Sequence, residues 1–261
     1  MLIEKYKHLL SILSNYNRCA IAVSGGLDSL FLATTAQRLL GSNMMAISIS
    51  TPYMQKSEQE YMIKQLKKHE IKYDILTIGT PINIRFNPEN RCYLCKSHLF
   101  EKILKLGHLK GFKTIMDGTN ADDMQLHRPG LKALKNLDIK SPLKEADLTK
   151  NEIRQLANLL GYDFYNRDSN SCLLTRLPYN YPVILSELRM IEKAEDYLIN
   201  LHFNEIRVRS NHESGCIEVR PEQIYRMKTH LSNPLTEKYF KALGFNNIKI
   251  NDVGYLTGKH I

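Results

Sequence analysis

The chain has 261 residues, 43% of them hydrophobic, which is enough for one large domain or a core domain with a smaller partner. No apolar run approaches the roughly 20 residues that cross a bilayer, and the N-terminus lacks the plan of a signal peptide, so we expect a cytoplasmic protein without a membrane partner. A formal charge of +9 favours an anionic partner such as a nucleotide or RNA, and the five cysteines are better explained as ligands, nucleophiles or core residues than as disulfides.

The first half of the chain alternates apolar, strand-like runs with helical patterns. Strands are predicted at residues 19–23, 44–49, 73–78 and 114–117, and helices at 30–40, 57–70, from near 92, and at 151–160. Capping boxes, Ser57 with Glu60 and Thr149 with Glu152, mark two helix starts. This alternation predicts an α/β domain with a doubly wound parallel sheet over residues 1–170.

The composition changes after this domain. A polar stretch at residues 166–171 ends in Cys172, and Pro178 and Pro182 follow. We interpret it as the connection to a second domain at residues 171–261. There the pattern predicts helices at 186–202, after Pro221 and at 237–243, and strands at 205–210, 216–220 and 247–250. The second domain is therefore expected to be a smaller α+β unit.

The loop after the first strand has the character of a phosphate-binding site. Its residues are Ser24, Gly25, Gly26, Leu27, Asp28 and Ser29. Backbone N–H groups and the helix dipole favour an anion there, and the glycines allow close approach of a phosphate. The carboxylate of Asp28 makes sense beside a phosphate if it holds Mg²⁺. The alternative is a tight turn with incidental serine and glycine.

This loop resembles the SGGxDS motif of the PP-loop ATP pyrophosphatases, which include GMP synthetase, NAD synthetase, argininosuccinate synthetase and several tRNA-thiolating enzymes. The resemblance implies cleavage of ATP between its α and β phosphates, leaving an adenylated substrate and pyrophosphate. ATP is then expected along the carboxyl ends of the strands, near Ser50. Gly118 and Thr119 open another polar loop after a strand, with Arg128 beyond it, and are expected at the same site.

Later segments narrow the resemblance. These are residues 141–143, 148–154 and 171–179, the last containing Cys172, Arg176 and Pro178. Together with the PP-loop they resemble the LarE family of ATP-dependent sulfur transferases, whose pattern near the cysteine is close to C-L-A-S-R-x-P-Y-G. This chain departs from it at Leu174, Thr175 and Asn180. The resemblance covers most of the chain.

The LarE resemblance implies adenylation of a carboxylate of pyridinium-3,5-biscarboxylic acid mononucleotide and replacement of AMP by sulfur. The product is a thiocarboxylate for nickel-pincer cofactor synthesis. Cys172 is the candidate nucleophile, with Asp28 and Arg176 as the other catalytic candidates, and Arg167 and Arg176 flank the thiol and would favour its thiolate. In members with a lone cysteine here, the enzyme surrenders its own sulfur. A small buried linker residue is the alternative for Cys172.

Two further cysteines, Cys92 and Cys95, stand three residues apart at a helix start. With Cys172 they can hold a 4Fe-4S cluster that leaves one iron open for an extra sulfide, as in a cluster-bearing branch of the LarE family. A zinc site that includes His98 and a pair without metal are the alternatives. Cys19 and Cys216 lie in strand-like patterns and are expected in the core.

Four residues are candidates for a phosphate group of the nucleotide substrate: Lys96, Arg207, Arg209 and Glu195. Arg207 and Arg209 alternate on a predicted strand and should share one face. Solvated surface side chains are the alternative.

There are two rival functions. One is a tRNA-thiolating PP-loop enzyme, which would have a nucleic acid as its partner, and the other is a non-catalytic nucleotide-binding scaffold. Other pincer-synthesis enzymes and further copies of the chain are expected partners.

Overall fold

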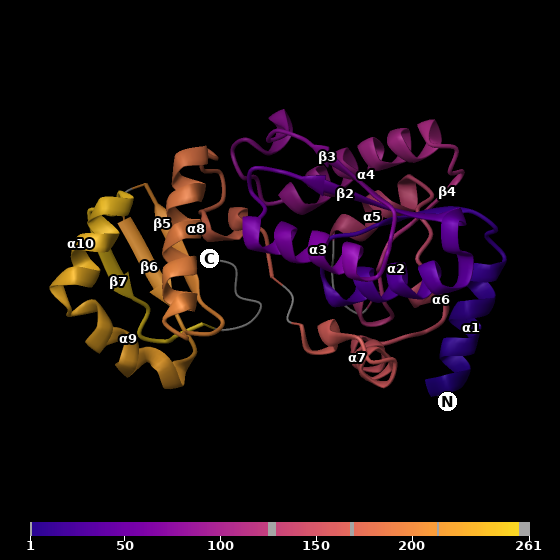
Figure 1. The fold of residues 1–261 in the computed structure, drawn as a ribbon. Helices are drawn as coiled ribbons and strands as arrows, with labels where there is room; N and C mark the ends of the chain where they lie inside the picture. Colours follow the sequence, from indigo (N-terminus) through magenta and orange to yellow (C-terminus); the bar gives the residue numbers. More distant parts are fainter. Residues whose placement is uncertain (1, 125–128, 168–169, 213, 256–261) are drawn as a thin grey trace. The chain divides into compact units, whose positions relative to one another are not determined.

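The computed structural model describes residues 2–124, 129–167, 170–212 and 214–255 (Figure 1). The chain forms two compact units. One comprises Met1–Pro81 and Asn90–Asn170, and the other comprises Ile82–Glu89 and Ser171–Ile261. In the described part of the chain, no helix is long and apolar enough to cross a membrane.

A four-stranded parallel sheet forms the centre of the first unit, in the order β3-β2-β1-β4 (Figure 1). Its strands are β1 (Cys19–Ala22), β2 (Met44–Ser50), β3 (Tyr73–Thr77) and β4 (Thr114–Met116). Strands β2 and β3 extend from one side of β1, whereas β4 pairs with its other side. The side on which the chain adds strands therefore reverses between β1 and β4. In open α/β sheets the carboxyl ends of the strands form a ligand-binding crevice at this point.

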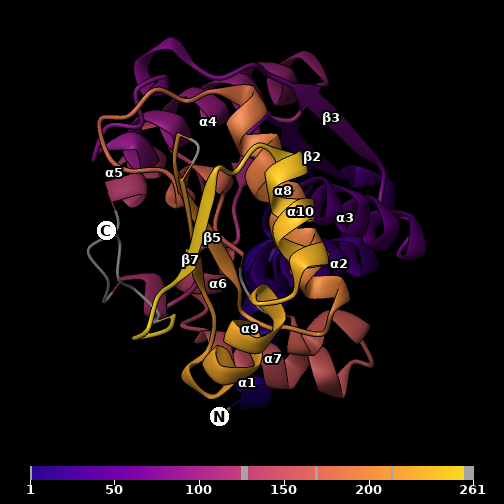
Figure 2. The same ribbon diagram turned by 90° about the vertical axis from the view of Figure 1, so that its left-hand side faces the viewer.

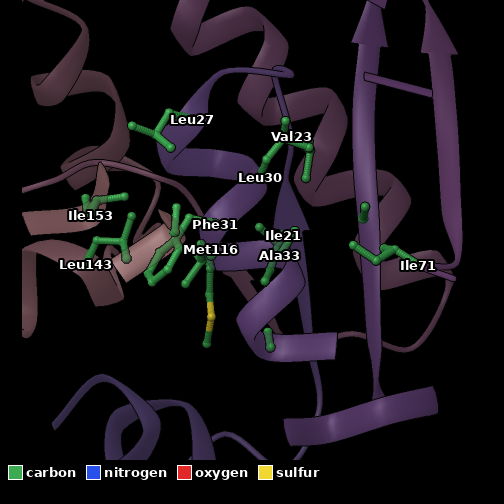
Figure 3. Packing of buried hydrophobic residues seen from close by; sticks show 14 of the residues in the cluster. Ile21, Val23, Leu27, Leu30, Phe31, Ala33, Ile71, Met116, Leu143 and Ile153 are labelled. Atoms are coloured by element: carbon green, nitrogen blue, oxygen red, sulfur yellow. The ribbon is translucent and has the colours of Figure 1, made fainter. Parts of the chain in front are cut away.

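Helices cover both faces of this sheet. They are α1 (Leu2–Ser14), α2 (Leu27–Leu40), α3 (Lys56–Lys68), α4 (Arg91–Leu109), α5 (Pro129–Asn136), α6 (Pro142–Glu145) and α7 (Lys150–Leu159), with short 3-10 turns η1 (Gly41–Asn43), η3 (Asp122–Met124) and η4 (Asp163–Asn166). On one face Ile21 belongs to a core with Phe31 and Ile153 (Figure 3), and on the other Ala20 belongs to a core with Phe100. The predicted doubly wound α/β fold is confirmed.

One of the two predicted capping boxes is present. Thr149 accepts a hydrogen bond from the backbone N–H of Glu152, and the Glu152 carboxylate accepts one from the backbone N–H of Thr149. The other was wrong. Ser57 is the second residue of α3, which begins at Lys56, and the N-cap residue Gln55 makes no side-chain capping bond. A Ser-x-x-Glu pattern inside a first helical turn cannot cap it.

The second unit contains a three-stranded mixed sheet with helices. Strands β5 (Arg207–Asn211) and β6 (Ser214–Glu218) are antiparallel, and β7 (Asn247–Ile250) pairs parallel with β6. The helices are α8 (Leu185–Asn200), α9 (Ile224–Leu231) and α10 (Pro234–Leu243), with 3-10 turns η2 (Ile82–Ile84), η5 (Leu173–Arg176) and η6 (Pro221–Gln223). Helix α8 contacts β5 and α10 (Figure 2). The predicted α+β architecture is confirmed.

An excursion of the chain at Ile82–Glu89 belongs to the second unit, although residues on both sides of it belong to the first. Its anchor is Asn87, which is fully buried. The Asn87 Nδ2 atom lies 3.2, 3.2 and 2.8 Å from three carbonyl oxygens, those of Leu174, Leu177 and Pro178 respectively. The backbone of Asn87 has a φ of 47°, a conformation that asparagine tolerates better than most residues. This side chain therefore joins the excursion to the segment that follows Cys172.

Candidate functional site

The predicted phosphate loop connects β1 to α2 at the switch between β1 and β4. Its two serines hold its shape. Ser29 Oγ accepts a 3.2 Å hydrogen bond from the backbone N–H of Ser24 and donates a 3.1 Å bond to the carbonyl oxygen of Gly26. Gly26 is the N-cap residue of α2 and provides no side-chain acceptor. The N–H groups of the first helical turn are therefore left for a ligand, and the helix dipole favours an anion there.

Two glycines allow the backbone to pack closely around this loop. Gly25 has a φ of 86°, and a Cβ atom there would lie 2.9 Å from Met62 Cβ. Gly118 follows β4, and a Cβ atom on it would lie 2.7 Å from the backbone nitrogen of Ser29 and 2.9 Å from its Cα. Glycine at position 118 thus lets the loop after β4 lie directly against the phosphate loop. The structure brings these two predicted segments together.

Asp28, in the first turn of α2, carries the charge of this loop. Its Oδ2 atom lies 3.5 Å from Lys150 Nζ, while its Oδ1 atom is buried without a hydrogen-bond partner. Burial raises the pKa of the Asp28 carboxyl group, Asp123 adds to the rise, and Lys150 opposes it. A buried carboxylate oxygen without a partner suits Mg²⁺, which prefers hard oxygen ligands. Asp28 therefore fits the predicted role of holding this ion beside the phosphates.

A second carboxylate, Asp117, organises the loop after β4. Its oxygens accept hydrogen bonds from Thr119 Oγ1 at 2.5 Å and from Ser141 Oγ at 2.7 Å. Lys96 Nζ lies 3.7 Å from Asp117 Oδ2. Thr119, predicted to contact ATP, thus directs its hydroxyl group to Asp117, and Lys96, predicted to contact a substrate phosphate, lies beside the same carboxylate. Asp117 connects these two residues, and the sequence reasoning missed it. Arg128 lies outside the described residues.

The carboxyl end of β2 has hydroxyl groups whose hydrogen-bonding capacity is not met. Ser50, predicted to lie near ATP, accepts a 2.9 Å hydrogen bond at its carbonyl oxygen from the backbone N–H of Ile78. The neighbouring Ser48 Oγ and Thr51 Oγ1 atoms are buried and have no hydrogen-bond partner. Buried hydroxyl groups usually find partners, so this strand end is suited to a polar ligand. Backbone pairing of β2 with β1 places it next to the phosphate loop in the sheet.

Cys92 and Cys95 lie in the first turns of α4, as the sequence predicted. Cys92 is exposed, and Cys95 is partly buried with its sulfur 3.2 Å from the hydroxyl oxygen of Tyr53. Both belong to the first unit, whereas Cys172 belongs to the second. Among the described residues, no three or more His, Cys, Asp or Glu side chains form a group that could hold a metal ion. His98 therefore does not complete such a group with Cys92 and Cys95.

Cys172 is the N-cap residue of η5 and is partly exposed. The segment is held by Arg176, whose side chain is fully buried. Arg176 Nη1 donates to the carbonyl oxygens of Ser171 at 2.9 Å and Cys172 at 3.2 Å. Arg176 Nε and Nη2 each donate a 2.9 Å hydrogen bond to Glu195. Arg176 therefore positions Cys172 by binding the backbone carbonyl oxygen of Cys172.

Glu195, a predicted phosphate-site residue, is also almost fully buried. Besides Arg176, its carboxylate accepts a 2.9 Å hydrogen bond from the backbone N–H of Val208 in β5. It therefore links α8, η5 and β5. The sequence could not show this, because the three segments are far apart along the chain.

Arg207 and Arg209 alternate with the buried residues Val208 and Ser210 on β5, so their side chains share one face of the strand. Arg209 is engaged, donating 2.8 Å hydrogen bonds to Glu218 and to the carbonyl oxygen of Thr175. Arg207 donates to the carbonyl oxygen of Ile206 at 2.6 Å. Burial and the nearby Arg176 lower the pKa of the Arg207 guanidinium group, whereas Glu195 and Tyr255 oppose this. A phosphate group would relieve the unfavourable environment of this charge.

Arg167, predicted to favour the Cys172 thiolate, contacts Glu58 and Tyr61 of its own unit. Within the first unit it donates a 2.6 Å hydrogen bond to Glu58 and stacks over the ring of Tyr61 at 3.5 Å. Asp168 and Ser169, which follow it, lie outside the described residues.

Lys150 is the most informative residue that the sequence reasoning missed. It is the first residue of α7, where a cation is disfavoured by the positive end of the helix dipole. That conflict is visible in the sequence, because Lys150 stands between Thr149 and Glu152 of the predicted capping box.

The chain is similar both to an uncharacterized protein and to proteins whose names state an enzymatic activity. No protein-family model matches the chain. The chain is 34% identical to the uncharacterized protein slr1717 of Synechocystis, with 99% of this chain and 97% of that protein covered. It is 24% identical to the pyridinium-3,5-bisthiocarboxylic acid mononucleotide synthase of Lactiplantibacillus plantarum, with 99% and 94% covered. It is 26% identical to one component of the glutamine-hydrolyzing GMP synthase of Methanopyrus kandleri, but over 55% of this chain and only 50% of that protein.

Proposed function

Because the chain belongs to the family of slr1717 and is a distant relative of a pyridinium-3,5-bisthiocarboxylic acid mononucleotide synthase, we propose that it is an ATP-dependent sulfur transferase of the PP-loop type. Its proposed substrate is a carboxylate of pyridinium-3,5-biscarboxylic acid mononucleotide. Its products are a thiocarboxylate, AMP and pyrophosphate. The observation that carries the proposal is the position of the Ser24 to Ser29 loop. It lies at the uncapped N-terminus of α2, at the switch between β1 and β4.

The first unit supports the adenylation step. A substrate carboxylate oxygen forms a bond to the α-phosphorus of ATP, and the bond from that phosphorus to the bridging oxygen breaks, so the electron pair leaves with pyrophosphate. The N–H groups of the first turn of α2 are oriented to bind the phosphates. Mg²⁺ at Asp28 would reduce their negative charge. A carboxylate is a poor electrophile, and the mixed anhydride with AMP provides a good leaving group.

The second unit supports the transfer of sulfur and the binding of the substrate phosphate. Cys172 is held through its backbone by Arg176, which gives this thiol a fixed position. Arg207, in the same unit, has the charge and surroundings that favour a phosphate. In this proposal the first unit activates the substrate, and the second unit binds the substrate phosphate and contributes Cys172 to sulfur transfer.

The source of the sulfur is part of the proposal. Cys92 and Cys95 lie three residues apart at the start of α4, a spacing that lets two thiols bind one metal centre. We propose that Cys172 is the third thiol of this centre. Three thiolates suit a 4Fe-4S cluster with one open iron, which would bind hydrosulfide taken up from solution. This sulfur would displace AMP from the mixed anhydride, so that Cys172 is retained.

The test begins with anaerobic purification followed by iron and sulfide analysis. Intact mass is then measured before and after turnover with ATP, the pyridinium mononucleotide and inorganic sulfide. We expect release of AMP and pyrophosphate, about four iron atoms per chain, and Cys172 retained. Iron-free protein that loses one sulfur per turnover would establish the sacrificial use of Cys172 instead. Turnover that depends on tRNA, or ATP binding without pyrophosphate release with any carboxylate offered, would overturn the proposed function.

A further inference from the structure

Lys150 approaches the phosphate loop from a distant part of the sequence. Its Nζ atom lies 3.5 Å from Asp28 Oδ2, and its side chain is 35% exposed. Asp28 is in the first turn of α2, the turn whose N–H groups are left for a ligand. The ammonium group is therefore adjacent to the position of the phosphates and is accessible to them.

The placement of Lys150 is built by several contacts. The Asp122 carboxylate accepts a 2.8 Å hydrogen bond from the backbone N–H of Lys150, and the Thr149–Glu152 capping box sets the start of α7. Lys5 Nζ lies 3.0 Å from Glu152 Oε2. These contacts hold the first turn of α7 beside the phosphate loop. They keep a cation at a helix N-terminus, where the dipole opposes it, so a compensating anion is needed.

The charges around the phosphate loop indicate which anion, besides Asp28, Lys150 can bind. Among residues 24–29, Asp28 is the charged one and is negative, and Asp123 lies near enough to raise its pKa. The triphosphate of ATP adds about four negative charges at neutral pH, and a loop that itself contains a carboxylate cannot bind them without cations. Asp28 balances the charge of Lys150 before the nucleotide binds. The phosphates can balance it once ATP is bound.

We propose that Lys150 binds the β and γ phosphates of ATP and stabilises the negative charge that collects on pyrophosphate as it leaves the α-phosphorus. The inference rests on the proposed function and adds a catalytic residue to it. The ammonium group remains protonated throughout. The bond from the carboxylate oxygen to the α-phosphorus forms, the bond to the bridging oxygen breaks, and its electron pair departs with pyrophosphate next to Lys150.

The experiment compares Lys150→Met with Lys150→Arg and with Lys144→Met. Lys144 is an exposed lysine of α6 in the same unit, so its replacement removes the same charge from the surface and keeps the backbone hydrogen bond of Lys144 to Thr119. Binding of ATP, pyrophosphate and AMP to the full chain is measured by calorimetry with Mg²⁺ present, and pyrophosphate release is followed with the carboxylate substrate.

For Lys150→Met we expect ATP and pyrophosphate to bind at least about tenfold more weakly, AMP to bind as before, and the turnover rate to fall about 10²-fold or more. Lys150→Arg should recover part of the loss, and Lys144→Met should match the original protein. Equal weakening of AMP and pyrophosphate binding would show a merely structural role, and unchanged pyrophosphate binding would overturn the assignment. If the original protein itself binds neither ATP nor pyrophosphate, the proposed function fails with it.

Discussion

Arg176 and Glu195 form a fully buried ion pair in the second unit, with two parallel hydrogen bonds of 2.9 Å between guanidinium and carboxylate. Arg176 also donates a hydrogen bond to the carbonyl oxygen of Cys172, and Glu195 accepts one from the backbone N–H of Val208. The pair therefore fixes the candidate sulfur donor to the sheet that carries Arg207. Its geometry gives the first of four predictions.

Arg176→Met should lower the free energy of unfolding of the second unit by about 3 kcal/mol or more, because it leaves the buried Glu195 carboxylate without its cation. Denaturant unfolding followed by circular dichroism measures this loss. The control is Glu237→Gln, which removes one partner of the exposed pair between Glu237 and Lys241 and should cause no resolvable change. An equally small effect of Arg176→Met would contradict the importance of the buried pair.

Gly118→Ala should destabilise the first unit by about 1–3 kcal/mol and weaken ATP binding, because the added methyl group would meet backbone atoms of Ser29 at 2.7 and 2.9 Å. Unfolding and nucleotide titrations measure both effects. Gly79→Ala is the matched control, since a Cβ atom at position 79 meets nothing within 4 Å. If the two variants behave alike, the loop after β4 does not support the phosphate loop.

Glu152→Gln should destabilise the first unit at neutral pH and have a vanishing effect in acid. Burial acts to raise the pKa of Glu152, but the hydrogen bonds from Thr149 and Lys5 prevail and lower it below the ordinary value of 4.5. The ionised form is thus favoured in the folded state. Its contribution is present above pH 4.5 and is lost as the pH falls through the lowered pKa.

The Gln side-chain oxygen can keep the capping bond, so the variant removes only the negative charge beside Lys5 and at the N-terminus of α7. We therefore expect a difference of about 0.5–1 kcal/mol between the original protein and Glu152→Gln at neutral pH, the usual size of such a charge effect. The measurement is the free energy of unfolding of both proteins as a function of pH. A difference that grows as the pH falls would have the wrong sign for this explanation.

Cys19 and Cys92 should differ strongly in alkylation. Burial raises the pKa of the Cys19 thiol to about 12, so only about 10⁻⁴ of it is thiolate at pH 8, and the side chain is also inaccessible. Cys92 is exposed. Metal-free native protein treated with iodoacetamide should carry the label on Cys92 and not on Cys19, as read by peptide mass spectrometry. Denatured protein, in which both react, is the control; native labelling of Cys19 would refute its burial.

The sequence by itself determined the fold class and the position of the phosphate loop. Continuous apolar runs between helical patterns are typical of strands buried on both faces, and β1 and β2 are such strands. The strand at residues 247–250 was predicted with the bounds that β7 has. The Ser24 to Ser29 loop was recognisable because its chemistry lies in six consecutive residues. Local patterns of this kind need no knowledge of the rest of the chain.

Only the tertiary structure decided which distant residues meet. Lys150 and Asp28, Arg176 and Glu195, and Asn87 and the Cys172 segment are each far apart in sequence, and no local pattern pairs them. The excursion at Ile82–Glu89 is of the same kind, because its membership of the second unit follows from buried hydrogen bonds and not from its composition. Side-chain partners of this sort arise when packing of the sheet and helices brings loops together, and single-sequence periodicity carries no information about that packing.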